Sequence, residues 1–287
     1  MKRVGIIGSS GLVGTELVLL LENDPCVPKP LHFFGRSDHF EFEGLTHLFI
    51  ATPSDVARKI APLAIAQGVK VIDLSSAHRM SQDSCLFHPG FSFEMARQQL
   101  FSIPNCIVAI MMSVLAPLHK QFQIERIFVA TYQAASGAGK EGLEELLFQK
   151  PPSVFPHPLH QNLFLHESAQ GEEEKIVQET KRFLGQDVRI HARTVRVPVL
   201  RAHSMTLNVT FKNKVDTTEL LAILAKEKSL RYSPSPTPKI AEGVQEVFYG
   251  PIRQDFTLKN SFDLWVCGDQ LLRGAALTAL ECLKAGI

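Results

Sequence analysis

The sequence predicts an α/β protein with two domains, and three observations lead to this prediction. Short apolar strands alternate with helical segments from the N-terminus, and a glycine turn joins the first strand to the first helix. After residue 120 the strands become longer and alternate apolar with polar residues. With 287 residues, 45% of them hydrophobic, the chain is long enough to build two packed domains.

The first region reads as strand, helix, strand, strand, helix, strand, in the ranges 2–8, 9–24, 30–34, 46–52, 54–68 and 69–75. Its strands are continuous apolar runs, which is typical of a parallel sheet covered by helices on both faces. Ser54 is a plausible N-cap of the second helix, and Gly68 follows its last turn.

The later strands suit a mainly antiparallel sheet with helices on one side, and they are expected at 125–133, 187–200, 204–213 and 261–268. Two segments rich in proline and serine, 150–160 and 229–239, are expected to be loops. The C-terminal segment 270–286 is helical and should pack on the first domain. We therefore expect a dinucleotide-binding domain over 1–105 and 269–287, and a catalytic and dimerisation domain over 106–268.

Charge and cysteine content exclude several classes of protein. Lys and Arg total 30 against 29 for Asp and Glu, so there is no electrostatic reason to expect nucleic acid or an anionic membrane as partner. No stretch reaches the roughly 20 apolar residues that span a bilayer. The cysteines show no Cys-x-x-Cys pair and no metal-like spacing, so we expect no metal, and reduced thiols in a cytoplasm. They are Cys26, Cys85, Cys106, Cys267 and Cys282.

A glycine turn carries the first chemical signal. It follows a strand and opens a helix, so its backbone can approach a pyrophosphate at the helix N-terminus, as in a Rossmann domain. Glycines also make ordinary strand-to-helix turns, but the flanking elements favour a dinucleotide. The residues expected to bind it are Gly8, Ser9, Ser10, Gly11, Leu12, Val13 and Gly14.

The end of the second strand indicates which dinucleotide. An acidic residue there would favour NAD by holding the ribose 2′-hydroxyl, but this strand ends in Phe34, Gly35, Arg36 and Ser37. Arg36 and Ser37 suit the 2′-phosphate of NADP.

Cys106 follows Pro104 and Asn105 and directly precedes a helical apolar run. The unpaired amides and dipole of a helix N-terminus stabilise a thiolate, whereas an ordinary buried thiol gains nothing from this placement. A dinucleotide domain with an activated cysteine indicates aldehyde or acyl-phosphate redox chemistry through a thioacyl intermediate.

At this point the sequence resembles the aspartate-semialdehyde dehydrogenase family, nearly from end to end. The motifs that carry the resemblance are GSSGLVG, IDLSSAHRM, PNC, TYQAASGAGKEGLEELL, FPHPLHQNL, QETKRFLG, RTVRVPVLRAHS and LWVCGDQLLRGAAL. The resemblance implies that Cys106 is the nucleophile and His203 the acid/base. It also implies that Gln133 helps to hold the thioacyl intermediate.

For the substrate, the resemblance implies that Arg196 binds the carboxylate and Glu179 the ammonium group. Arg79 and Asn105 match positions that bind phosphate.

The residues themselves support these roles unequally. Arg193 and Arg196 face opposite sides of a strand, so one can enter a cleft. Glu179 has Arg182 one turn away, which suits a zwitterionic, phosphorylated substrate, although the segment 172–182 is equally typical of a charged helix surface. A lone histidine such as His203 is more often structural than a base.

Two further positions are expected near the cofactor or substrate. The turn at Ser136 and Gly137 can bring a ligand close to backbone amides, or it can be only a loop. Gln270 stands where the family usually has an asparagine near the nicotinamide.

The chain also departs from the family at two other points. Only SDHFEFEGL separates Arg36 from the next strand, and Ile107 and Val108 replace the usual small hydroxyl residues. These departures indicate a divergent but working enzyme.

The predicted reaction is the NADP-dependent reductive dephosphorylation of L-aspartyl 4-phosphate to L-aspartate 4-semialdehyde, in lysine and diaminopimelate, threonine and methionine biosynthesis. One alternative is an N-acetyl-glutamyl-phosphate reductase, whose usual PGCY motif fits PNCI less well. Another is a catalytically inactive dinucleotide sensor, which would need neither Cys106 nor His203. A homodimer or tetramer is expected from the resemblance.

Overall fold

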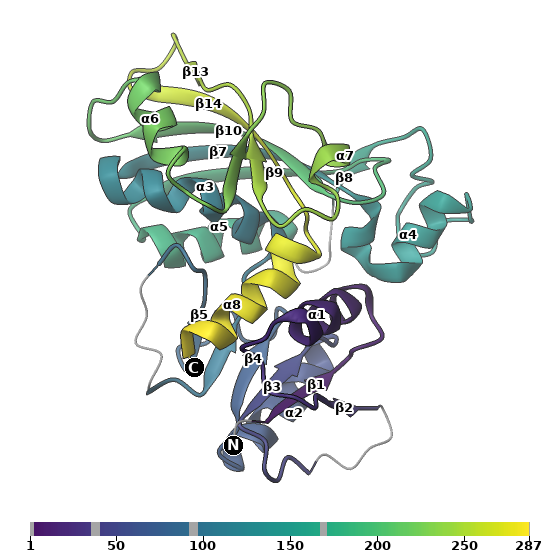
Figure 1. Ribbon diagram of the computed structural model, residues 1–287. Coiled ribbons are helices and arrows are strands. Elements are labelled where there is room, and N and C mark those ends of the chain that lie inside the picture. The colour runs from purple at the N-terminus through teal and green to yellow at the C-terminus, as the bar shows by residue number, and fades with distance from the viewer. Residues whose placement is uncertain (1–2, 36–40, 92–96, 167–170, 287) are drawn as a thin grey trace. The chain divides into compact units, whose positions relative to one another are not determined.

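Figure 1 shows the computed structural model, which describes residues 3–35, 41–91, 97–166 and 171–286. The chain forms two compact units. Unit 1 is Met1–Asn105 with Gly274–Ile287, and unit 2 is Cys106–Arg273. Residues 269–273, which the sequence analysis assigns to the first domain, belong to unit 2 because Asp269 and Gln270 bond to its loops.

Unit 1 contains a parallel sheet of six strands in the order β2-β1-β3-β4-β6-β5. The strands are β1 (Val4–Ile7), β2 (His32–Phe34), β3 (His47–Ile50), β4 (Lys70–Asp73), β5 (Ser84–Leu86) and β6 (Leu100–Ser102). Every residue of β1 and β3 is buried, as expected for strands covered on both faces. The strand order reverses at β1, and ligands of open parallel sheets bind at the carboxyl ends of strands at such a point.

Three helices cover this sheet: α1 (Leu12–Asn23), α2 (Ser54–Ala66) and α8 (Leu277–Gly286). Ser54 is the first residue of α2 and Pro53 is its N-cap, so the predicted cap is shifted by one residue. Figure 1 shows α8 beside α1, and their apolar side chains share one core cluster with β1 and β3. The C-terminal helix therefore completes the fold of the N-terminal unit.

Unit 2 contains an eight-stranded sheet in the order β11-β12-β14-β10-β7-β9-β8, with β13 paired to β14. The strands are β7 (Ile124–Gln133), β8 (Phe164–Leu165), β9 (Arg189–Arg196), β10 (His203–Phe211), β11 (Leu230–Tyr232), β12 (Val247–Tyr249), β13 (Arg253–Gln254) and β14 (Ser261–Gly268). The pairs β7–β9 and β11–β12 are parallel and the other pairs are antiparallel. The sheet is thus mixed and mainly antiparallel, as predicted.

The helical segments of unit 2 are α3 (Cys106–Phe122), η2 (Ala135–Ala138), α4 (Gly139–Leu147), α5 (Glu172–Leu184), α6 (Thr217–Leu224) and α7 (Pro238–Ala241). The π-helical η3 (Leu272–Ala276) begins in unit 2 and continues into unit 1 at Gly274. α3 contacts β7, β10, β12 and β14, and α5 packs on β9 and α3. Because α3 is apolar on nearly all sides, it is buried along most of its length.

The proline-rich segment 229–239 is not only a loop, which corrects the sequence prediction. Leu230–Tyr232 pairs with β12 as β11, and Pro238 is the first residue of α7. Both elements are short, so the local composition did not reveal them.

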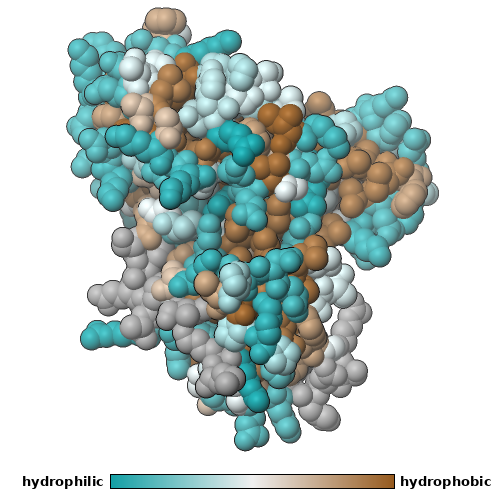
Figure 2. Space-filling model, in the orientation of Figure 1, coloured by the Kyte–Doolittle hydropathy of each residue, from teal (hydrophilic) through white to brown (hydrophobic). Residues whose placement is uncertain are grey.

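Hydrophobic side chains gather on the surface over α4 and the segment that follows it (Figure 2). Leu147 is 48% exposed, Phe148 67% and Leu163 62%. An exposed apolar patch is typical of a surface that another protein covers. In the described part of the chain, no helix is long and apolar enough to cross a membrane.

Candidate active site

Cys106 is the first residue of α3, and its thiol is half-buried. The first N–H groups of a helix have no partner within it and carry a partial positive charge, so a negative charge on sulfur is stabilised there. Ile107 and Val108, which replace the family's hydroxyl residues, are fully buried in the core. They help to fix the start of α3 by packing.

Arg196 ends β9 and is only 1% exposed, whereas Arg193 is exposed and pairs with Glu173. NH1 of Arg196 donates to the carbonyl oxygen of Ala134 at 2.5 Å, and the Arg196 guanidinium lies 5.4 Å from the ring centre of Phe155. Burial lowers the pKa of Arg196 to about 10, although negative charge on Cys106 and Glu172 acts to raise it. Arg196 is therefore a buried cation near the thiol.

Gln133 ends β7, and the parallel register pairs it directly with Arg196. Its side chain is 1% exposed. The amide oxygen lies 3.1 Å from Nδ1 of His166, and the amide nitrogen lies 3.3 Å from the hydroxyl of Thr131. The sheet thus places the two predicted residues side by side.

His203 begins β10 and is fully buried. Its Nδ1 accepts a 3.0 Å hydrogen bond from the backbone N–H of Ala134. Among the described residues, none is hydrogen-bonded to its Nε2. Burial, followed by the nearby charges of Arg196 and His166, lowers its pKa well below 6.5. The ring is therefore neutral at neutral pH.

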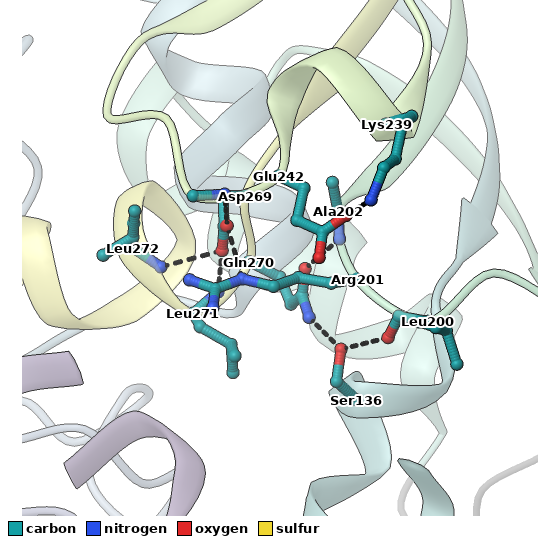
Figure 3. Close-up of polar contacts among 11 residues, drawn as sticks. Ser136, Leu200, Arg201, Ala202, Lys239, Glu242, Asp269, Gln270, Leu271 and Leu272 are labelled. Carbon is teal, nitrogen blue, oxygen red and sulfur yellow. Dashed lines mark hydrogen bonds and ion pairs between the residues drawn. The ribbon is translucent and has the colours of Figure 1, made fainter. Parts of the chain in front are cut away.

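The loop before His203 is fixed by hydrogen bonds from the end of β14 (Figure 3). Ala202 has a left-handed backbone with φ of 70°, and its N–H donates to the Gln270 side chain at 2.8 Å. The Gln270 amide nitrogen donates to the Ser136 hydroxyl at 2.5 Å, which in turn donates to the carbonyl oxygen of Leu200 at 2.6 Å. Gln270 therefore connects the turn at Ser136 to the residue that precedes His203.

Asp269 holds the other side of the same loop. One carboxylate oxygen accepts from Arg201 at 2.6 Å and from the N–H of Gly243 at 2.7 Å, and the other accepts from the amides of Leu271 and Leu272 (Figure 3). The carboxylate is fully buried, so these bonds offset the loss of its hydration.

Gly137 leaves space beside these groups. A Cβ atom at this position would lie 3.0 Å from Cε1 of His203 and 3.1 Å from NH1 of Arg196. Any larger side chain would crowd the His203 ring and the Arg196 guanidinium, so the turn at Ser136 and Gly137 lies beside these two predicted residues.

Two groups near Arg196 were not identified from the sequence. His166 lies beside both Gln133 and Arg196, and the charge of Glu172 acts on His166 and Arg196. Glu172 also lies 3.6 Å from Lys175, one turn along α5. The Glu-x-x-Lys spacing was visible in the sequence, but the charged run 172–175 does not show which acid points inward.

Glu179 is only 1% exposed, so it does not belong to a solvated helix surface. It shares the buried face of α5 with Glu172, from which it is two turns away, about 10 Å along the axis. Arg182 is half-buried near the end of the helix.

The glycine turn of unit 1 fits a dinucleotide. A Cβ atom on Gly8 would lie 2.3 Å from the Ala51 carbonyl oxygen, and one on Gly14 would lie 2.0 Å from that of Gly8, so both positions require glycine. At Gly11 the nearest atom would be 3.7 Å away and the backbone is exposed. The turn is thus packed tightly against the protein at Gly8 and Gly14 and is open at Gly11, where α1 begins. Ser10 is exposed there, and Ser9, Leu12 and Val13 are half-buried.

The remaining predicted residues of unit 1 lie near the ends of its strands. Nε of Arg79 donates to the carbonyl oxygen of Ile103 at 2.9 Å, and Asn105 is 6% exposed. His78 lies 2.7 Å from the Asp73 carboxylate. Arg36 and Ser37 lie outside the described residues.

Two family models match the chain. Residues 31–99 match "Semialdehyde dehydrogenase, NAD binding domain", and residues 115–273 match "Semialdehyde dehydrogenase, dimerisation domain".

Relatives and solved structures match over nearly the full length. The chain is 36% identical to an aspartate-semialdehyde dehydrogenase of Synechocystis, over 97% of this chain and 95% of the relative, and 32% identical to that of Rickettsia bellii, over 97% and 96%. It superposes with a TM-score of 0.93 and 25% identity on aspartate semialdehyde dehydrogenase II of Vibrio cholerae complexed with ASA, covering 99% of this chain and 97% of that one.

Proposed function

The chain belongs to the aspartate-semialdehyde dehydrogenase family, and we propose from this membership that it converts L-aspartyl 4-phosphate to L-aspartate 4-semialdehyde with NADPH. It is an oxidoreductase of amino-acid biosynthesis. The observation that best supports the reaction is that Cys106, Gln133, Arg196 and His203 are all held in unit 2, with three of them around the Ala134 backbone.

Cys106 is the proposed nucleophile. The start of α3 and the buried cation of Arg196 both favour a thiolate. Its sulfur attacks the acyl carbon of the substrate, a carbon–sulfur bond forms, and the bond from that carbon to the phosphate oxygen breaks. The product of this step is a thioester on Cys106 and free phosphate.

His203 acts on the oxygen of the tetrahedral intermediate. Because Nδ1 accepts from Ala134, the neutral ring carries its proton on Nε2, and that N–H is a hydrogen-bond donor. A buried N–H directed at developing negative charge stabilises it more than a solvated one would. His203 thus supplies a proton or hydrogen bond to the oxygen, rather than taking the proton from the thiol.

Unit 1 is the proposed cofactor-binding domain, in which Gly11 and the first amides of α1 would hold the pyrophosphate. When bound, the nicotinamide supplies the hydride that reduces the thioester to the aldehyde. Arg36 and Ser37 remain the proposed determinants of NADP. The side chains of Ser136 and Gln270 are hydrogen-bonded to each other. A direct role for either residue at the nicotinamide is a further proposal.

Arg196 is the proposed partner of the substrate carboxylate. For the ammonium group Glu179 remains the proposed partner, and Glu172 is a second candidate because its charge acts on Arg196 and His166. Neutralising the residue that binds the ammonium group should raise KM for the semialdehyde. A comparison of Glu172→Gln with Glu179→Gln would therefore identify this residue. The roles of Arg79, Asn105 and Arg182 toward phosphate remain proposals.

The assembly is proposed to be a homodimer through unit 2, which the matching dimerisation-domain model supports, and a tetramer would need a second interface. The cytoplasm is the proposed compartment.

The test is phosphate-dependent reduction of NADP with aspartate semialdehyde, beside N-acetylglutamate semialdehyde as competitor. Cys106→Ala should abolish turnover while NADP binding and folding remain unchanged, and Cys26→Ala is the matched control at an exposed thiol. Substantial turnover by Cys106→Ala, or preference for the acetylated substrate, would contradict the proposal.

A further inference from the structure

His166 lies between two residues of the proposed active site. Its Nδ1 is 3.1 Å from the amide oxygen of Gln133, and its Nε2 is 3.2 Å from NH2 of Arg196, which is also 3.4 Å from Nδ1. The backbone is fixed as well, since the N–H of His166 donates to the carbonyl oxygen of Thr194 at 2.8 Å, two residues before Arg196.

These contacts determine where the proton of the ring lies. The Gln133 oxygen can only accept, so Nδ1 must donate to it, and Nε2 of the neutral ring carries no proton. NH2 of Arg196 lies almost equally far from the two ring nitrogens, so the guanidinium packs over the face of the ring rather than along the Nε2 lone pair. The Gln133 nitrogen is meanwhile directed to Thr131. The neutral Nδ1–H form of His166 satisfies both neighbours.

A protonated ring would satisfy only one of them. It would place a second positive charge against the guanidinium of Arg196. Burial and the charge of Arg196 lower the pKa of His166 to about 4, despite the opposing charge of Glu172. The neutral form is therefore the working form at neutral pH.

We infer that His166 is a positioning residue that orients the amide of Gln133 through Nδ1–H and the guanidinium of Arg196 through the face of its ring. The inference rests on the proposed function, in which Gln133 holds the thioacyl group and Arg196 the substrate carboxylate. The His166 imidazole then contacts both Gln133, which aligns the reacting carbon, and Arg196, which binds the carboxylate at the other end of the substrate.

Two substitutions separate the two contacts. In His166→Asn the amide nitrogen occupies the place of Nδ1, so the bond to Gln133 is kept and the ring that packs on Arg196 is lost. In His166→Phe the ring that packs on Arg196 is kept and the donor for Gln133 is lost. His160→Asn is the matched control, an exposed histidine of the same segment.

Steady-state kinetics with aspartate semialdehyde should show a split. His166→Asn should raise KM about tenfold with kcat within about threefold, and His166→Phe should lower kcat about tenfold with KM within about threefold. His166→Leu should change both parameters. Equal changes in kcat and KM for the Asn and Phe variants, or no change in either, would overturn the inference.

The tautomer gives a readout that does not depend on turnover. In protein labelled with 15N-histidine, nitrogen chemical shifts at pH 7.5 should identify a neutral Nδ1–H ring, assigned to His166 by its disappearance in His166→Asn. An Nε2–H or doubly protonated His166 would refute the inference. If the unmodified enzyme did not turn over aspartate semialdehyde, the proposed function would fail, and the tautomer would still decide the His166 contacts.

Discussion

The backbone N–H of Ala134 donates a 3.0 Å hydrogen bond to Nδ1 of His203. A backbone amide cannot accept, so this nitrogen cannot take up a proton without losing the bond. Protonation would also place a second cation near Arg196 in a buried site. The peptide unit after Gln133 therefore keeps His203 neutral and leaves Nε2–H as its only donor.

Replacing His203 with asparagine should remove this donor, because the shorter side chain has no atom at the place of Nε2. Loss of a positioned acid/base group typically costs about 10² to 10⁴-fold in rate, so turnover should be slow but measurable. Cys106 should still react with iodoacetamide, as measured by mass spectrometry. A variant that turns over at the unmodified rate would show that His203 is structural.

The same geometry predicts the pH dependence of kcat/KM. Since the pKa of His203 lies well below 6.5, the unmodified enzyme should lack an inflection near pH 6.5 that depends on this residue. Profiles of the unmodified enzyme and of His203→Asn between pH 5.5 and 8.5 check this. If the unmodified enzyme shows an inflection near pH 6.5 that His203→Asn lacks, the His203 ring is not neutral at neutral pH.

Arg196→Lys should raise KM for aspartate semialdehyde by about tenfold or more and also slow turnover. Lysine keeps the charge but cannot form the planar, bidentate contact with a carboxylate, and it would lose the bond to the Ala134 carbonyl oxygen. Arg193→Lys is the matched control on the exposed side of β9. An unchanged KM in Arg196→Lys would remove Arg196 from the substrate site.

Glu145 supports Arg196 from a distance. Its carboxylate accepts from the amides of Ser153, Val154 and Phe155, and the Phe155 ring lies under the guanidinium. Burial acts to raise the pKa of Glu145, but these hydrogen bonds outweigh it and the pKa is lowered. Glu145 is thus an anion that fixes this loop.

Glu145→Gln should lower the free energy of unfolding by about 1–3 kcal/mol, because an amide offers one acceptor oxygen in place of two charged ones. Urea denaturation measures this, and KM should rise as Phe155 moves. Glu144→Gln, at the neighbouring surface position, is the control and should change neither. A fully stable Glu145→Gln enzyme with normal KM would contradict the assignment.

His166 should make the fold sensitive to acid. Its pKa is about 4 in the folded protein and about 6.5 when unfolded, so between these values only the unfolded chain binds the proton. Stability is then fully present above pH 6.5 and falls as the pH decreases toward 4. The loss is below about 1.4 kcal/mol per pH unit, because the side chain is partly exposed to solvent.

The urea concentration at the midpoint of unfolding should be lower at pH 5 than at pH 7.5. His166→Asn should make this difference smaller, whereas His160→Asn should leave it unchanged. An unchanged difference in His166→Asn would mean that His166 is not the group whose protonation destabilises the fold.

Much of the fold could be predicted from local pattern. The apolar run around Ile6 and the glycines at 8, 11 and 14 specify a strand, a turn and a helix through backbone sterics alone. β11 could not be predicted, because Leu230–Tyr232 becomes a strand only through its pairing with Val247–Tyr249.

The site could be predicted only where a residue's local position carried the chemistry. Cys106 at a helix start is such a case. Glu172 and His166 are not, since the direction of Glu172 depends on how α5 packs, and His166 reaches Arg196 through the β8–β9 pairing. The opposing tautomers of His166 and His203 likewise arise from tertiary contacts with Gln133 and Ala134.

The discontinuity of unit 1 has a consequence for biosynthesis. Unit 2 is a single continuous segment, but the core of unit 1 includes Ala276 and, from α8, Ala279, Leu280 and Leu283. A ribosome therefore releases every strand of unit 1 long before the helix that covers Leu17 and Leu21 has emerged. Until then these side chains stay exposed to chaperones or to aggregation, so a premature stop before Leu277 would leave the core of unit 1 incomplete.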